Sequence, residues 1–405
     1  MLTCIISALI LSVIPDLTSW SEWTASGVTV TEEWSLNVMD RIDSAFRHLG
    51  DVYGVESEAG FHWHTILVAE DYVLHFEDDS LIDSLRYDGD IDFITFSPNH
   101  RYLLGYSGMD RTMKLFDFDE STVKYQLVFS HDMEFHSGPS LNLTDDGEII
   151  AKHSTYLRIY DADFNVIISK DDFEWGGSFI GMTDDGSRMY SSDDFIIRAF
   201  NENAEEIWST DLPATDDDFP NRYFTVSNTG EYLAVSDQTR LYLYDAITGN
   251  VISEYRFEAD LRKPEFSEND RYLIVGEFTH PEVTPLRPEE GFGLILLTVA
   301  ESALDIISEF YSPGSRDDLP NTFSNYRVAN DGTSVGMLYY APGFLRIALF
   351  SNESECQWMS GNASLYEPYP SKAWFIEQQQ GISADATRIW YYDGRSLHAC
   401  IVGGI

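Results

Sequence analysis

Short apolar runs alternate with polar turns along the chain, and one such pattern recurs over most of its length. The clearest copy spans residues 224–252, where an apolar run, a Ser-Asn-Thr-Gly turn and two further alternating runs follow one another. Alternation with a period of two predicts β-strands, because successive side chains of a strand point to opposite faces. The pattern therefore predicts units of four short strands joined by tight turns.

The third strand of this pattern ends in a polar residue and gives the period of the repeat. The copies are 40 to 44 residues apart, and the five clear ones end at Glu77, Asp117, Asp161, Asn201 and Asp245. Weaker and more widely spaced copies lie at residues 294–298, 346–350 and 397–400. A four-stranded repeat of about 40 to 45 residues is typical of one blade of a β-propeller.

Turns of small polar residues precede the second strands and mark the units independently. They lie at residues 97–100, 144–147, 183–186, 227–230, 267–270, 330–332 and 383–385. Gly, Asn and Asp suit them because a two-residue hairpin requires positive φ angles. With one further unit at 55–90 that lacks this turn, the count is eight, within the usual four to eight blades. We predict an all-β fold, a single propeller of four-stranded blades, with eight blades favoured over seven.

The repeat resembles the WD-repeat family and, more loosely, the quinoprotein-type propeller repeats. The Trp-Asp pair of that family corresponds here to Phe116-Asp117, Tyr160-Asp161 and Tyr244-Asp245. Asp110, within residues 107–112, stands where the family has a structural acidic residue, whereas the Gly-His pair of the family is absent. The resemblance covers residues 90–260 best, and it implies the fold without implying a partner.

A propeller must join its first and last blades, because an open ring leaves two sheet edges unpaired. The last unit supplies only three strands, so we expect residues 27–31 to add the fourth, as their alternating β-branched residues suit an outer strand. Residues 34–49 follow, with apolar residues at helical spacing, namely Leu36, Met39, Ile42, Phe46 and Leu49. We predict a closing strand and one short helix over residues 27–54 and the propeller over residues 55–405.

Residues 1–26 are predicted to be a signal peptide or an N-terminal apolar segment of the domain. The apolar run is too short to span a bilayer and matches the central part of a secretory signal. No Lys or Arg precedes it, so a buried strand or helix is the alternative. We expect a secreted or cell-envelope protein without a transmembrane span, with a cytoplasmic location as the alternative. Export would permit a disulfide between Cys356 and Cys400, which otherwise are two buried thiols.

The charge is strongly negative, with 25 basic and 68 acidic residues and a net charge of −43. The acids occur in every unit, and such a surface repels phosphate, which excludes nucleic acid as a partner. Three interpretations remain: solvation in saline surroundings, contacts to Ca²⁺, or docking of a basic partner.

The segments that link one unit to the next are the best candidates for a binding face, because equivalent loops of a propeller gather on one side. Those at residues 170–177, 211–220, 259–263 and 311–319 bring carboxylates and aromatic residues together. This combination suits a basic peptide, a cationic small molecule or a sugar. The candidate binding residues are Phe135, His136, Trp175, Asp217, Phe219 and Arg316. Residues 278–292, with three prolines, would reach a partner or cap the ring.

Three patterns can be compared with metal sites. His62 and His64 share one face of a predicted strand and would need a third ligand to bind a metal. Residues 131–136 are rich in donors and lie in a loop between blades. Asp161, Asp163 and Asn165 open like a Ca²⁺ loop, yet Val166 stands where such a loop needs Gly. We interpret all three mainly as structural and assign no metal ligand.

No catalytic signature is present: the sequence contains neither Gly-x-Ser-x-Gly, nor a phosphate-binding loop, nor His-Glu-x-x-His. We therefore favour a non-enzymatic, monomeric binding or scaffold module without a cofactor. It would present an acidic, aromatic-containing loop face to a protein or small-ligand partner. The alternative is a lactonase-like hydrolase with Ca²⁺ in the central channel, and a structural envelope component is a third interpretation.

Overall fold

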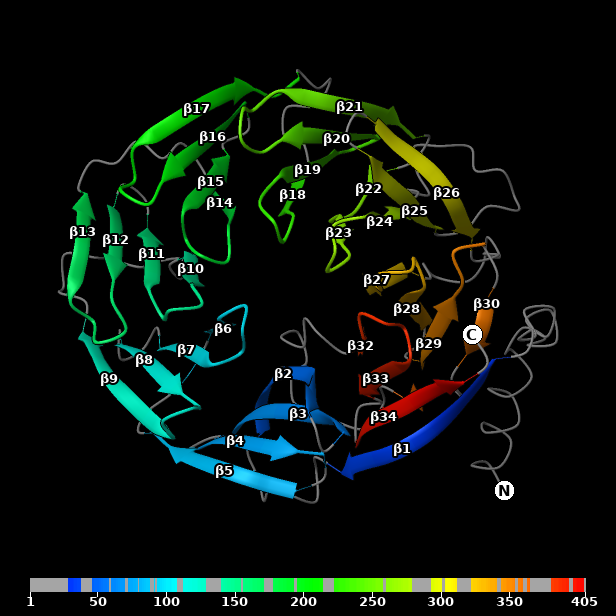
Figure 1. Ribbon diagram of the computed structural model, residues 1–405, viewed down its shortest axis with the longest axis horizontal. Coiled ribbons are helices and arrows are strands. Elements are labelled where there is room, and N and C mark those ends of the chain that lie inside the picture. The colour runs from blue at the N-terminus through cyan, green and yellow to red at the C-terminus, as the bar shows by residue number, and fades with distance from the viewer. Residues whose placement is uncertain are drawn as a thin grey trace, which may run out of the picture.

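The computed structural model shows a closed ring of antiparallel sheets around a central axis (Figure 1). It describes residues 28–37, 46–57, 60–69, 72–78, 80–87, 91, 93–107, 112–128, 140–153, 156–170, 178–192, 195–213, 222–257, 260–278, 293–300, 303–311, 322–340, 344–353, 356–359, 363–364, 380–392 and 396–403. Over these residues the chain forms eight sheets, which confirms the propeller and its eight blades.

The first four blades follow one another in sequence, and each runs from the channel outward. Blade 1 is β2 (Phe46–Ser57), β3 (Gly60–Ala69), β4 (Tyr72–Glu77) and β5 (Ser80–Arg86). Blade 2 is β6 (Phe93–Phe96), β7 (Tyr102–Ser107), β8 (Thr112–Asp117) and β9 (Thr122–Val128). Blade 3 is β10 (Ser140–Leu143), β11 (Ile149–His153), β12 (Tyr156–Tyr160) and β13 (Val166–Lys170). Blade 4 is β14 (Ser178–Met182), β15 (Arg188–Ser192), β16 (Ile196–Asn201) and β17 (Glu206–Asp211).

The remaining blades keep this order, with two interrupted strands. Blade 5 is β18 (Arg222–Val226), β19 (Tyr232–Asp237), β20 (Arg240–Asp245) and β21 (Val251–Arg256). Blade 6 is β22 (Asp260–Leu261) with β23 (Glu265–Phe266), β24 (Tyr272–Phe278), β25 (Gly293–Ala300) and β26 (Ala303–Tyr311). Blade 7 is β27 (Thr322–Val328), β28 (Ser334–Tyr340), β29 (Phe344–Phe350) and β30 (Cys356–Met359) with β31 (Ala363–Ser364). Blade 8 is β32 (Gln380–Ile382), β33 (Arg388–Tyr392), β34 (Ser396–Gly403) and the N-terminal β1 (Thr29–Asn37).

The third strand of each blade is buried on both faces, which explains its apolar sequence. In β20, Leu241 and Leu243 pack toward blade 6 and belong to one core cluster. The intervening Tyr242 and Tyr244 belong to a second cluster, which blade 5 shares with blade 4. Consecutive side chains thus fill alternate seams, as the period of two in a strand requires.

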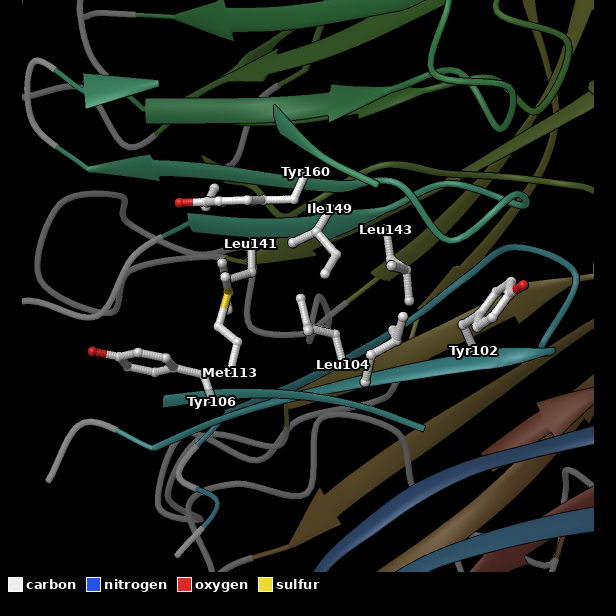
Figure 2. Packing of buried hydrophobic residues seen from close by; sticks show 10 residues of the cluster. Tyr102, Leu104, Tyr106, Met113, Leu141, Leu143, Ile149 and Tyr160 are labelled. Atoms are coloured by element: carbon white, nitrogen blue, oxygen red, sulfur yellow. The ribbon is translucent and has the colours of Figure 1, made fainter. Parts of the chain in front are cut away.

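Each seam is a compact apolar layer between neighbouring sheets. Figure 2 shows the seam between blades 2 and 3, where Leu104 and Met113 face Leu141 and Ile149, with tyrosines at the margins of the cluster. Most of these side chains are almost completely excluded from solvent. Burying a large apolar side chain contributes about 1.5–3 kcal/mol, so the seams are the main source of stability of the ring.

The seven polar turns lie where predicted, but their geometry differs from a two-residue hairpin. Each is closed by a hydrogen bond from the amide of its fourth residue to the carbonyl of its first, as from Gly230 to Ser227 at 2.9 Å. Only the fourth residue has a positive φ, at His100, Gly147, Gly186, Gly230, Asp270, Gly332 and Ala386. In the turns that begin with Ser or Thr, the first side chain adds a bond, as where Ser227 Oγ accepts from Tyr232 N at 3.0 Å.

The N-terminal strand closes the ring, as predicted. β1 pairs antiparallel with β34 from Thr29 opposite Gly403 to Asn37 opposite Ser396. His398 Nδ1 lies 2.7 Å from Glu32 Oε2 across this pair. The first and last blades also meet directly, since the guanidinium of Arg388 lies 3.9 Å from the ring centre of Phe61.

The short helix is not found at the residues that suggested it. Leu36 lies in β1, and Phe46 and Leu49 lie in β2, while residues 38–45 are outside the described residues. The helical spacing of these apolar residues is overridden because strand pairing closes the ring and builds blade 1. Blade 1 therefore begins with β2 at Phe46.

Cys400 is a free thiol, buried in the core cluster of blade 8, so it forms no disulfide with Cys356. Burial raises the pKa of the Cys400 thiol to about 12, which keeps it protonated and unreactive at neutral pH. Residues 1–26 lie outside the described residues, and within the described chain there is no helix of the length and apolarity needed to cross a membrane.

The tight contact between the turns of blades 4 and 5 gives a test of the ring geometry. Gly230 has a φ of +69°, and a β-carbon added there would lie 2.4 Å from Thr183 Cγ2. Gly230→Ala should therefore lower the free energy of unfolding by about 2–3 kcal/mol, from the left-handed backbone and the clash together. Equilibrium urea denaturation measures this change.

Thr183→Ser is the matched control because it removes Cγ2 and keeps the hydroxyl that accepts from Arg188 N at 3.1 Å. When Gly230→Ala is introduced together with Thr183→Ser, the loss that it causes should shrink by about 1–2 kcal/mol. An equal loss with and without the control substitution would show that the two turns do not press on one another.

Candidate functional site

The two ends of the ring are built differently. At one end, here called the turn face, the first strand of each blade turns into the second and the third turns into the fourth. At the other end, here called the loop face, the outer strand of each blade leads to the inner strand of the next. The segments between described strands there include residues 129–139, 171–177, 214–221, 312–321 and 365–379. The long connections of the chain thus belong mainly to the loop face.

On the turn face, neighbouring turns hydrogen-bond to one another around the channel. Asn99 N donates to Asp145 Oδ1 at 2.7 Å, which joins blades 2 and 3. Asn228 N and Thr229 N both donate to Asp270 at 2.8 Å, which joins blades 5 and 6. Many carboxylates of this face are therefore structural acceptors.

Asp184 shows how crowded with charge this face is. Its pKa is raised, first by burial and then by the neighbouring carboxylates Asp145, Asp185 and Asp270. In the described part of the chain, no group of three or more His, Cys, Asp or Glu residues has an arrangement that could hold a metal ion. The described residues thus give no support to the Ca²⁺-dependent hydrolase alternative.

The turns between third and fourth strands explain the motif that resembles a Ca²⁺ loop. Asp161 Oδ1 accepts from Asp163 N at 2.9 Å and from Asn165 N at 2.8 Å. Its Oδ2 accepts from the Asn165 side-chain amide at 2.8 Å. The carboxylate is used to shape the turn, as the structural interpretation predicted.

A hollow of about 230 Å³ lies in the central channel between the inner strands of blades 2 to 6. Its apolar lining is Phe96, Leu143, Met182, Phe224 and Val226, and its polar lining includes Asn142, Thr225 and Lys263. These side chains come from β6, β10, β14, β18 and the break between β22 and β23. The wall over blades 2 to 5 is therefore mixed, and polar atoms make up more of its accessible surface than apolar atoms do.

Cationic groups appear in the channel on the side of blades 6 and 7. Lys263 Nζ and Arg327 Nη1 each lie 3.4 Å from Glu265 Oε1. Two cations thus share one carboxylate, and the cluster carries a net charge of about +1 at neutral pH.

The six candidate residues of the loop face lie outside the described residues. Phe135 and His136 fall in 129–139, Trp175 in 171–177, Asp217 and Phe219 in 214–221, and Arg316 in 312–321. The insertion predicted at residues 278–292 likewise lies outside the described chain apart from Phe278. These residues stay predictions.

His62 and His64 share one face of β3, as predicted, and both meet partners that the spacing could not reveal. His62 Nδ1 lies 3.0 Å from Asp78 Oδ2, and His64 Nδ1 lies 2.9 Å from Nε2 of His75 on β4. Tyr53 stacks between His64, with centroids 5.2 Å apart, and His100 of blade 2, at 4.1 Å. The result is an imidazole cluster in the seam between blades 1 and 2.

Burial governs the protonation of this cluster. Desolvation, helped by His64, lowers the pKa of His75 to about 4, and desolvation also lowers the pKa of His64. The hydrogen bond to Asp78 raises the pKa of the more exposed His62. The acidic groups that act on the cluster are Glu33, Glu77, Asp78 and Asp83. Two neutral rings suffice for the His64–His75 hydrogen bond, since one ring donates its N–H to the other, and protonation of both rings would place two cations side by side.

The channel hollow was missed because its lining comes from five separate blades. A signal nevertheless exists in the sequence. Phe96, Leu143, Met182 and Val226 each directly precede the first residue of a polar turn, at Ser97, Thr144, Thr183 and Ser227. Aligning the units on the turn rather than on the third strand would have placed these residues together.

Comparisons with known proteins confirm the fold. The structure is similar to BamB from Moraxella catarrhalis, with a TM-score of 0.57 and 9% identity over 92% of this chain and 100% of that one. It is also similar to Kluyveromyces lactis Hsv2 with loop 6CD replaced by a Gly-Ser linker, with a TM-score of 0.50 and 12% identity over 78% and 97% of the two chains. A lower TM-score of 0.48 relates it to the β-propeller domain of Cps50 (Swd1) from Myceliophteria thermophila, at 13% identity over 79% and 98%.

No family model and no curated protein matches the sequence. At such low identity the structural likeness shows the fold alone. The WD-repeat resemblance is thus supported at the level of the β-propeller and is not confirmed as membership of that family.

The imidazole cluster predicts an acid-sensitive seam. Because the folded pKa values of His75 and His64 lie below the unfolded value of about 6.5, their neutral forms stabilise the fold above that pH. This contribution is lost as the pH falls from about 6.5 toward 4. Urea denaturation at pH 7.5 and 5 should show a smaller loss for His75→Gln than for the unmodified chain, by about 1–2 kcal/mol.

His62→Gln is the control of opposite sign. The raised pKa of His62 adds stability that is fully present below about 6.5 and is lost as the pH rises through the folded pKa. Removing it should therefore steepen the loss at acid pH. If all three proteins had the same pH dependence, the cluster would not control acid stability.

Proposed function

We propose that the chain is a non-enzymatic binding module, a propeller scaffold whose loop face receives a basic protein partner. The observation that carries this proposal is the unequal construction of the two faces. Short, mutually hydrogen-bonded turns make up the turn face, whereas the long connections between blades lead from the loop face. Binding residues occur preferentially on loops that a rigid scaffold positions.

The chemistry of the connecting segments supports a basic partner. Residues 171–177 and 214–221 carry several carboxylates beside Trp175 and Phe219. Aromatic faces attract cations by about 0.5–1 kcal/mol at exposed sites, and neighbouring carboxylates add charge complementarity. A net charge of −43 would also attract a basic partner over long range and raise the association rate at low salt.

Localisation belongs to the same proposal. The apolar run in residues 1–26 supports export to the envelope or the exterior, where the module would meet its partner. Intact-mass measurement of the chain recovered from an expressing cell and its medium would test this: removal of an N-terminal segment is expected, and retention of residue 1 would contradict export.

The binding proposal is tested with defined peptides on the immobilised chain. A twelve-residue peptide of alternating Lys and Tyr should bind more tightly than analogues carrying Ser or Glu in place of Lys. The double variant Asp217→Asn, Phe219→Ala should weaken the Lys-Tyr peptide at least fivefold, because a carboxylate and a ring are removed together. Biolayer interferometry at 50 and 150 mM salt measures the change.

Asp146→Asn is the matched charge control, since Asp146 is an exposed carboxylate of the turn face. It should change the affinity less than twofold. Equal losses in the two variants would mean that the peptide responds to overall charge and that no loop-face site exists.

A further inference from the structure

We propose that the central channel contains a second binding site, for a small anionic ligand with a ring-sized body. Lys263 would meet the anionic group, and the mixed polar and apolar wall of blades 2 to 5 would contact the body. None of the candidate loop-face residues takes part, so this proposal does not depend on the proposed function.

The backbone around Lys263 is held in place by groups from three blades. β22 ends at Leu261 and β23 begins at Glu265, so residues 262–264 lie in a break of the inner strand. Ser236 Oγ of blade 5 donates to the Arg262 carbonyl at 2.8 Å, and Arg262 N donates to the Gly276 carbonyl at 2.8 Å. The hydroxyl of Tyr326 in blade 7 donates to the Lys263 carbonyl.

Breaks of this kind redirect a side chain without disturbing the rest of the sheet. Here the neighbouring Leu261 and Pro264 are buried, while Lys263 lines the hollow and keeps 57% of its side chain exposed. The fold thus fixes the main chain on both sides of Lys263 and leaves its ammonium group accessible in the channel. A fixed main chain with an accessible cationic end is suited to an anionic ligand.

The local charge at the hollow is positive, whereas the net charge of the chain is negative. Acidic residues outnumber basic ones by 68 to 25. Yet the residues that line the hollow include one charged group, and that group is Lys263. Glu265 partly neutralises it but also neutralises Arg327, so a net positive charge remains. An anion would therefore find its only favourable local charge here among the described lining residues.

The size and lining of the hollow define the body of the ligand. A cavity of about 150 Å³ lined by apolar side chains holds a benzene molecule. The hollow measures about 230 Å³ and, unlike that cavity, is partly open, so it leaves room for one or two fused rings and a short acidic arm. Phe96 and Phe224 lie in its lining and can contact such a body, and Asn142 and Thr225 offer hydrogen bonds.

The probes are three compounds that share a naphthalene ring: 2-naphthoate, the neutral 2-naphthamide and the cationic 2-naphthylmethylamine. Isothermal titration at 50 mM salt, supported by saturation-transfer NMR for weak binding, gives their dissociation constants. The full chain should bind the carboxylate at least fivefold more tightly than the amide, and the amine most weakly. No saturable binding, or tighter binding of the amine, would overturn the proposal.

Two variants separate the roles of charge and cavity. Lys263→Met should remove the preference for carboxylate over amide to within twofold while amide binding persists. Asn142→Phe should fill the hollow and weaken both compounds at least fivefold. Thermal unfolding of each variant shows whether the fold is kept, and Lys263→Arg should restore the preference.

Arg256→Met is the matched control, because Arg256 is an exposed cation on the outer strand β21 and its removal changes the net charge equally. It should leave the carboxylate preference within twofold of the unmodified chain. A preference that survives Lys263→Met, or one that falls equally in Arg256→Met, would overturn the assignment of Lys263.

Discussion

The structure depends on one constraint: every blade must bury both of its faces. A sheet in the middle of the ring has no solvent-facing side, so each third strand is apolar at consecutive positions, as Leu241, Tyr242 and Leu243 show. Such a sheet is stable only with a neighbour on either side, and the requirement passes around the ring until the last blade meets the first. The pairing of β1 with β34 is therefore a condition for all eight seams.

The same constraint explains why aromatic residues occupy the place of the Trp-Asp tryptophan. Phe116, Tyr160 and Tyr244 lie at or one residue before the end of the third strand, where the side chain points into the seam with the preceding blade. Any large ring fills that space, so tryptophan is not required. The polar residue that follows has a local role, since Asp245 accepts from Ile247 N at 2.8 Å and from Thr248 N at 2.9 Å. The pair of an aromatic and a polar residue at the end of the third strand can therefore be kept while the long-range hydrogen-bond partners of the polar residue change.

Most of the fold could be predicted from the repeat period and the polar turns, because both are local features of the sequence. The polar ends of the third strands and the small residues of the turns predicted the positions of the blades. The alternating apolar and polar residues after Gly27 predicted the closing strand. The predicted helix was wrong because the apolar residues from Leu36 to Leu49 match a helical spacing by coincidence. Those of them that the structure describes lie in the two strands β1 and β2. The candidate site was harder, because no local pattern tells that His75 lies beside His64 or that Lys263 and Phe224 line one hollow. Those contacts join different strands or blades, and only the closed ring brings them together.

The distribution of charge over the ring follows from how each face is built. The carboxylates of Asp145, Asp161 and Asp270 accept hydrogen bonds from backbone amides of the turns. Some of the acidic residues thus stabilise the turns. The acids of the connecting segments lie outside the described residues, and it is these that we propose to meet a partner. The hollow is lined by residues at the inner strands, and its one charged lining residue is the cation Lys263. Screening over about 8 Å at physiological salt separates these regions. Salt would therefore weaken the binding of a basic partner at the loop face. It would also screen the repulsion between the negatively charged chain and an anion that approaches the channel. The two proposed binding surfaces should thus respond differently to ionic strength.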